Sequence, residues 1–118
     1  MPTEPRSEPA DDEPSGAEVV EYAGSLDLVA VERFPLDDPH WRALLKKMLA
    51  ERIELWLRHD RPRLAQALYR LDVDEGPVAA ALSYHAGHDA AERVAELVLE
   101  RVESRVRNRD RLEAMLRA

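Results

Sequence analysis

Residues Leu64–Leu82, with the sequence LAQALYRLDVDEGPVAAAL, decide the fold class of this chain. The stretch reads as two short helices around a tight turn, which is the rhythm of a helix-turn-helix motif. Asp74 is the better cap for the second helix, because Pro77 then falls at the third helical position, whose N–H has no partner in any helix. We therefore predict two helices, over Arg61–Leu71 and Glu75–Ser83.

The second helix of this pair lacks the side chains that a DNA-reading helix needs. Such a helix carries groups that reach base edges or phosphates. This one begins with Asp74 and Glu75 and continues with the apolar run Val78–Leu82, and the three arginines of residues 60–82 all precede it. A domain that contacts phosphates normally shows a basic stripe. We therefore interpret the two helices as a packing pair inside a helical bundle.

A broad apolar stripe predicts a long helix before the pair. Pro39 suits the first helical position, where its missing N–H costs nothing, and Asp37 or Asp38 would precede it as the cap. Apolar residues then recur at spacings of three and four. They are Trp41, Leu44, Leu45, Met48, Leu49, Ile53, Trp56 and Leu57. We predict this helix over Asp38–His59, with Asp60 capping the helix that follows.

The longest predicted helix comes last. Asp89 and Glu92 have the spacing of a capping box, with aspartate in place of the usual serine or threonine. Valine, leucine and alanine mark one face as far as Val106, and the pattern can continue past a weak point at Asn108. We predict this helix over Asp89–Arg107 or beyond. A helix of that length would be longer than the one predicted over Asp38–His59, so its end would project from the bundle, bend back or pair with another chain.

The first 24 residues differ in composition from the rest. They hold four of the eight prolines and seven acidic residues against one basic residue, so they carry −6 of the chain's net charge of −7. Low apolar content combined with high like charge disfavours folding. We expect residues 1–24 to be a disordered acidic tail. Residues 25–36 are open between a strand, a short helix and an extended arm, and we favour an arm or short helix on a bundle formed by residues 38–118.

Composition also limits the class of protein. Cysteine is absent, which excludes disulfides, thiolate catalysis and cysteine-ligated metal sites. No apolar stretch approaches the roughly 20 residues that a membrane span needs. The N-terminus lacks the basic start and apolar run of a secretory signal. We expect a cytoplasmic protein with a single helical domain over residues 25–118.

Neither a catalytic site nor a metal site is indicated. His85, His88 and Asp89 resemble a corner of a metal site, but Gly87 interrupts the spacing and further ligands would have to come from distant histidines. The aspartates all have structural interpretations as caps or turn residues. No nucleophile elbow, phosphate loop or zinc-protease motif occurs in the sequence. We expect no enzymatic activity, no cofactor and no small-molecule substrate.

Two sets of residues are candidates for binding. Arg101, Arg105 and Arg109 recur every four residues and share a helix face suited to phosphates, to an acidic partner or to the chain's own acidic N-terminal region. The simplest alternative is a solvated face. Trp41 and Trp56 lie about four turns apart near one face of the first long helix, and we expect them in the core. If the core is too small for both, one of them marks a binding groove or a dimer seam.

Two segments together carry a resemblance to known proteins. LYRLDVDE, Leu68–Glu75, followed by DAAERVAELVLERVESRVRNR, Asp89–Arg109, resembles a group of uncharacterised small helical proteins from bacteria of the Bacteroidetes type. The shared features are a tyrosine–arginine–aspartate turn and a leucine- and valine-rich helix that ends in basic residues. The resemblance implies a helical fold and a bacterial source, and it implies no activity, cofactor or site residue.

The sequence therefore predicts an all-α bundle of about four helices with a long last helix. For function we expect a non-catalytic protein–protein interaction or adaptor module that self-associates as a homodimer, through the last helix or the tryptophan-bearing first one. The alternative is nucleic-acid binding through Arg101, Arg105 and Arg109. We expect no membrane partner.

Overall fold

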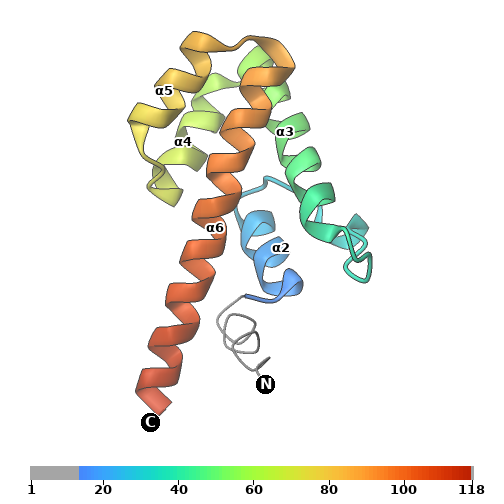
Figure 1. Ribbon diagram of the computed structural model, residues 1–118, viewed down its shortest axis with the longest axis vertical. Coiled ribbons are helices and arrows are strands. Elements are labelled where there is room, and N and C mark those ends of the chain that lie inside the picture. Colours follow the sequence, from blue (N-terminus) through green and yellow to red (C-terminus); the bar gives the residue numbers. More distant parts are fainter. Residues whose placement is uncertain (1–13, 118) are drawn as a thin grey trace, which may run out of the picture.

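The computed structural model describes residues 14–117, which form helices and loops without a strand. The elements follow one another in the order α2 (Gly16–Ser25), the short 3-10 helix η2 (Val31–Arg33), α3 (Trp41–His59), α4 (Arg61–Leu71), α5 (Glu75–Tyr84) and α6 (Gly87–Arg117) (Figure 1). This confirms the all-α class. The described part of the chain has five α-helices where four were predicted, and the additional one is α2.

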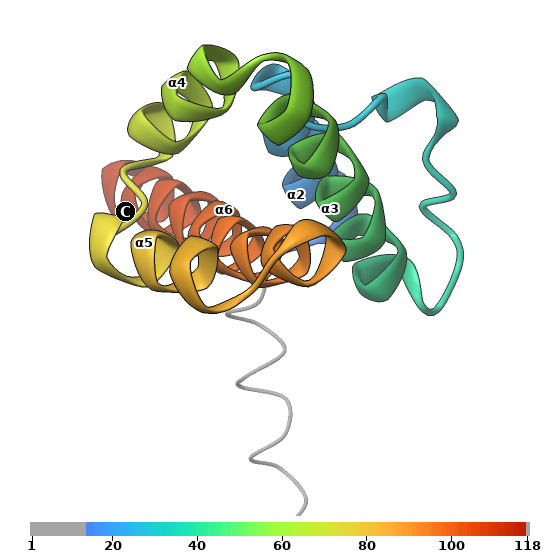
Figure 2. The same ribbon diagram turned by 90° about the horizontal axis from the view of Figure 1, so that it is seen from above.

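Helix α6 is the element on which the other helices pack. It contacts α2, α3, α4 and α5, and its interface with α3 is the most extensive. Figures 1 and 2 show α5 on one side of α6, with α2 and α3 on the other. Along α6 the buried side chains are Ala90, Ala91, Val94, Ala95, Val98, Leu99, Val102 and Val106. Beyond Val106 the helix continues without a break to Arg117 and extends past the other helices (Figure 1).

Helix α2 corrects the predicted boundary of the N-terminal region. Ser15 caps it in a capping box, because the Ser15 hydroxyl accepts from the Glu18 N–H and the Glu18 carboxylate accepts from the Ser15 N–H, both at 3.2 Å. Three of its side chains, Val19, Val20 and Ala23, are fully buried. The expectation of disorder is therefore wrong for residues 16–24, where burial against α3 and α6 stabilises a helix too short to persist alone. Residues 1–13 lie outside the described residues.

The segment between α2 and α3 is packed against the bundle. Leu28, Val29 and Phe34 are buried, and η2 is the one helical element that the structure describes between α2 and α3. Asp27 adopts a left-handed backbone conformation with φ of 64°. Its carboxylate forms an ion pair with Arg63 of α4, and its carbonyl accepts from Arg52 of α3 at 2.6 Å. Of the structures that the sequence left open for this segment, it therefore adopts the arm, with one short helical turn at η2.

Aspartate caps set the limits of α4 and α5 as the sequence indicated. The Asp60 carboxylate accepts from the Arg63 N–H at 3.3 Å, and that of Asp74 accepts from the Gly76 N–H at 3.3 Å. Helix α4 has the predicted limits, and α5 ends one residue later than predicted, at Tyr84.

The starts of the two long helices differ from the prediction. Helix α3 begins at Trp41 instead of Asp38, because the Asp38 carboxylate accepts from the His40 N–H at 2.7 Å and holds Pro39 in a turn before the helix. Helix α6 begins at Gly87, so Asp89 lies inside its first turn instead of capping it. None of the helices within residues 14–117 is both long enough and apolar enough to cross a membrane.

Candidate protein-interaction surface

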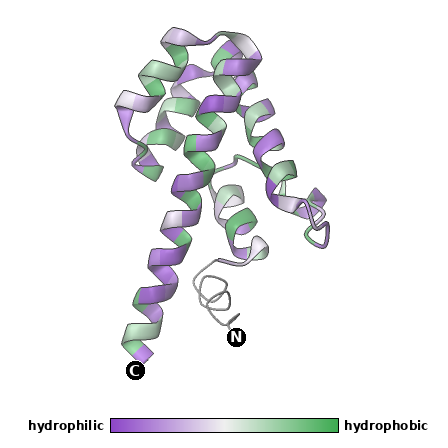
Figure 3. Ribbon diagram, viewed as in Figure 1, coloured by the Kyte–Doolittle hydropathy of each residue, from purple (hydrophilic) through white to green (hydrophobic). Residues whose placement is uncertain are grey.

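Helix α5 is apolar on all sides and yet mostly exposed. Its sequence is EGPVAAALSY, and Ala81 is its one buried side chain. Leu82 is 40% exposed and Tyr84 is 83% exposed. A helix that is apolar all round is normally enclosed by its neighbours. Figure 3 shows α5 at the outer edge of the bundle, and every residue of this helix apart from Ala81 is half-buried or exposed.

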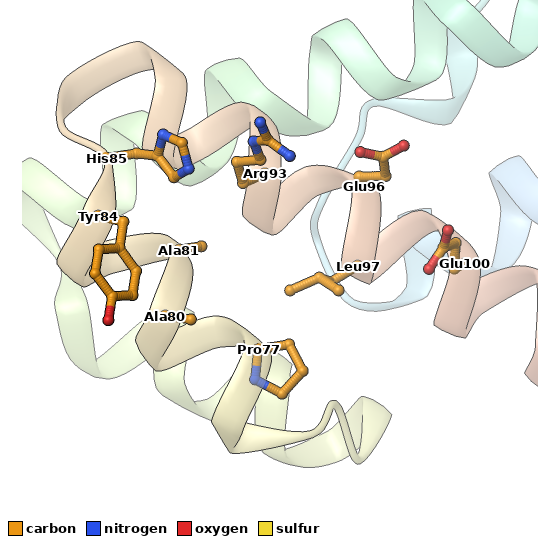
Figure 4. Close-up of a pocket in the computed structure, with 9 residues that line it drawn as sticks. All are labelled: Pro77, Ala80, Ala81, Tyr84, His85, Arg93, Glu96, Leu97 and Glu100. Carbon is orange, nitrogen blue, oxygen red and sulfur yellow. The ribbon is translucent and has the colours of Figure 1, made fainter.

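A groove of about 370 Å³ lies between α5 and α6 (Figure 4). We call it the α5–α6 groove. Its walls are Pro77, Ala80, Ala81 and Tyr84 of α5, His85 after α5, and Arg93, Glu96, Leu97 and Glu100 of α6. In Figure 4 Leu97 points from α6 into the space between the two helices. A smaller hollow of about 200 Å³ shares Pro77, Leu97 and Glu100 and extends the groove to Ser104.

The composition of the groove suits an α-helical ligand. Its apolar residues on α5 are small, so they let another helix approach closely, and Leu97 supplies the apolar side chain from α6. A tyrosine at one end adds a large, rigid contact of the kind that often dominates binding energy. Charged residues on α6 form the other edge. Apolar grooves between helices with charged edges bind amphipathic helices through apolar residues spaced three and four apart.

A second apolar feature lies on the projecting end of α6. Leu112, Met115 and Leu116 are 54%, 71% and 77% exposed. Their spacing of three and four places them together on the helix. The sequence shows this pattern but does not mark these residues as exposed, because the same pattern is expected for side chains that face a core.

The two tryptophans have structural positions. Trp56 is 4% exposed, and the guanidinium groups of Arg52 and Arg63 lie 5.8 and 5.4 Å from the centre of its ring. Trp41 is half-buried and covers the start of α2, where a Cβ added to Gly16 would lie 3.1 Å from Trp41 Cε2. Neither tryptophan lines the α5–α6 groove.

The three candidate arginines share a face of α6, and two of them bond to other helices. Arg101 Nε donates to the carbonyl oxygen of Leu71 at 2.8 Å, which joins α6 to α4. Arg109 Nη2 lies 3.4 Å from Glu18 Oε2, which joins α6 to α2. Glu18 belongs to the acidic region that the sequence suggested as a partner for these arginines. Arg105 is half-buried.

The histidines near the start of α6 contact carboxylates of different helices. His88 Nδ1 lies 3.2 Å from Glu54 Oε1 on α3, and His88 Nε2 lies 3.4 Å from Glu92 Oε2. The hydrogen bond to Glu54 is the main cause of a raised His88 pKa. His85 instead lines the α5–α6 groove. Over residues 14–117 no group of three or more histidine, aspartate or glutamate residues is arranged to hold a metal ion.

No known family, curated protein or solved structure matches this chain. The resemblance to small helical proteins of the Bacteroidetes type therefore stays a prediction.

Proposed function

We propose that this protein is a non-catalytic protein–protein interaction module that binds an α-helical segment of its partner in the α5–α6 groove. The observation that carries the proposal is the exposure of α5, an apolar helix that contacts α6 on one side and leaves Pro77, Ala80 and Tyr84 of the groove open to solvent. Covering such side chains stabilises a complex by roughly 1.5–3 kcal/mol for each large apolar residue that becomes fully buried.

The shape and chemistry of the groove support a helical partner over other ligands. Two helices form its walls, so it offers no free strand edge to an extended peptide. The small residues Pro77 and Ala80 on one wall leave room for the side chains of an approaching helix. Charges on Arg93, Glu96 and Glu100 at the other wall can pair with the polar face of that helix, which would fix its direction.

Nucleic-acid binding through Arg101, Arg105 and Arg109 has less support. Arg101 and Arg109 already bond to Leu71 and Glu18 within the chain. Breaking these contacts would oppose the gain from a phosphate, so we do not propose this function.

Crosslinking from a single position in the groove tests the proposal. The chain has no cysteine, so one cysteine can carry a photoreactive label without competing sites. Ala80→Cys places the label in the groove, and Ala43→Cys places it on an exposed position in the first turn of α3. Both labelled proteins are irradiated in extracts of the source cells, and the crosslinked peptides are identified by mass spectrometry.

We expect a crosslink from Ala80→Cys to an amphipathic helical segment, of another protein or of a second copy. We expect none from Ala43→Cys. The crosslink should be lost when Leu97→Glu is added, because this change places a charge on the apolar wall of the groove. Equal labelling from both positions, or labelling that survives Leu97→Glu, would contradict the proposal.

A further inference from the structure

We infer that the occupant of the α5–α6 groove is the projecting end of α6 from a second copy of the chain, in a two-fold symmetric dimer. The inference rests on the proposed function and names its partner. On the outward side of α6, exposed or half-exposed residues recur at helical spacing. They are Leu97, Glu100, Ser104, Arg107, Arg111 and Met115.

This outward stripe of α6 is complementary to itself when one copy is reversed. Leu97 and Met115 are eighteen residues apart, which is five turns, so both lie on one side of the helix about 27 Å apart. Glu100 follows Leu97 by three residues and Arg111 precedes Met115 by four. In an antiparallel pair of α6 helices with Leu97 of each copy level with Met115 of the other, Glu100 therefore lies within one residue of the level of Arg111, an offset of about 1.5 Å along the helix.

A two-fold axis makes each of these contacts occur twice. Such an interface uses the same surface on both copies and closes on itself, so it stops at a dimer. Near the axis, Ser104 lies within one residue of the level of Arg107 of the other copy, and neither side chain repels the other. The stripe thus has an apolar residue at each end, an acidic residue near one end and a basic residue near the other.

The groove and the projecting end of α6 meet in this arrangement. Leu97 and Glu100 are walls of the α5–α6 groove, so Met115 of the second copy would enter it beside Pro77 and Ala80. The two features that lack a cover in the described chain, the apolar side of α5 and the apolar end of α6, would then cover each other. Neither has to be explained by a separate ligand.

The net charges of the two surfaces also differ in sign. The α6 wall of the groove carries Glu96 and Glu100 with one arginine, Arg93. Residues 107–117 carry four arginines against two acidic residues. Opposite net charges favour the encounter and fix its direction. Residues 1–13 of the chain fit the groove less well, because they contain three prolines and five acidic residues and would face an acidic wall.

Sedimentation velocity over a concentration series of the full chain tests the dimer. We expect a reversible monomer–dimer equilibrium. Leu97→Glu in the groove and Met115→Glu on the projecting end should each weaken it by about tenfold or more, because each buries a charge opposite an apolar side chain. Leu55→Glu, at an exposed leucine of α3 outside both surfaces, is the matched control and should leave it unchanged. Circular dichroism confirms that each variant is folded.

A charge exchange tests the antiparallel register. Glu100→Arg and Arg111→Glu should each weaken the dimer alone, because each places like charges close to one another between the two copies. The double variant restores opposite charges and should restore the dimer. Mixing Leu97→Cys chains with Met115→Cys chains under oxidising conditions should yield the mixed disulfide, whereas Leu55→Cys chains should not join either.

The outcomes separate this inference from the proposed function. A chain that stays monomeric at all concentrations overturns the dimer, as does a dimer that neither Leu97→Glu nor Met115→Glu weakens. So does a double charge variant that stays as weak as the single ones. In each of these cases a crosslink from Ala80→Cys to a different protein still supports the interaction module. If no partner of any kind depends on the groove, both proposals fail.

Discussion

Arg42 of α3 and Glu103 of α6 form a two-pronged ion pair across the most extensive helix interface of the described chain. Arg42 Nε lies 2.7 Å from Glu103 Oε2, and Arg42 Nη2 lies 2.8 Å from Glu103 Oε1. The hydrogen bonds that Arg42 donates to the Glu103 carboxylate are the first cause of the raised Arg42 pKa. Both prongs require the planar guanidinium, so this pair favours one alignment of α3 and α6 along their lengths.

We expect Arg42→Lys to destabilise the fold although it keeps the charge. A lysine makes a single contact where arginine makes two. The loss should be about 0.5–1 kcal/mol in the free energy of unfolding, since the arginine is half-exposed and water screens the pair. Urea unfolding measures it. Lys46→Gln is the control, because Lys46 Nζ lies 4.0 Å from Glu96 Oε1 at the limit of an ion pair. Equal losses for both variants would contradict the prediction.

Gly24 and Gly76 should respond in opposite ways to alanine. A Cβ on Gly24 would clash with Val31 Cγ2, so the Val31 side chain or the backbone that carries it must shift. We expect Gly24→Ala to lower the free energy of unfolding by about 1–3 kcal/mol. A Cβ on Gly76 meets nothing closer than 3.8 Å, so Gly76→Ala should be neutral or stabilise by up to about 1 kcal/mol. Thermal unfolding compares them, and a stabilising Gly24→Ala would contradict the prediction.

Asp110 should destabilise the folded chain at neutral pH. Burial is the first cause of its raised pKa, and the neighbouring Glu18 carboxyl adds to it. A raised carboxyl pKa means that the folded state favours the protonated form. The stability that comes from the protonated Asp110 carboxyl is present below its ordinary pKa of 3.8. It is lost as the pH rises through the folded-state pKa of Asp110.

We therefore expect Asp110→Asn to be more stable than the natural chain at pH 7, by less than about 1 kcal/mol at this partly exposed site. The difference should shrink as the pH falls toward 3.8. Chemical unfolding at several pH values measures it. Glu51→Gln, which removes an exposed charge on α3, controls for the change in net charge. An advantage of Asp110→Asn that does not change with pH would rule out this explanation.

His88 should contribute to stability at acidic pH. Its pKa is raised from 6.5, first by the hydrogen bond to Glu54 and further by the charge of Glu92. For a raised histidine pKa, the stabilising contribution is fully present below 6.5 and disappears as the pH rises through the folded-state pKa. Glu54→Gln should move the His88 titration midpoint back toward the ordinary value. NMR titration of the imidazole signals measures this, and an unchanged midpoint would exclude Glu54 as the cause.

The part of the fold that follows from local chemistry could be predicted from the sequence. Asp60 and Asp74 act as caps in the structure, and the limits of α4 follow from them. The continuity of α6 past Asn108 could not be read, because a single polar residue neither continues nor ends an apolar pattern. Helix α2 was missed because acidic residues and prolines dominate the composition of residues 1–24, although the Ser15–Glu18 capping box was visible.

The candidate surface was harder to predict than the fold. Apolar residues at helical spacing look the same whether they face a core or solvent, so the sequence did not distinguish Leu112 and Met115 from Val98. For the same reason, the sequence predicted that α5 would be packed inside the bundle. The arginines were easy to notice because they are charged, but their contacts with Leu71 and Glu18 depend on the positions of other helices.

The place of α6 along the chain has a consequence for biosynthesis. The four other described helices all need α6 as a packing partner, and all of them precede it in the sequence. The ribosome therefore releases their apolar sides before it has made the residues that cover them. At about 5–20 residues per second, α6 takes a few seconds to appear. During that interval the nascent chain exposes apolar surface, which is what a molecular chaperone such as a holdase recognises.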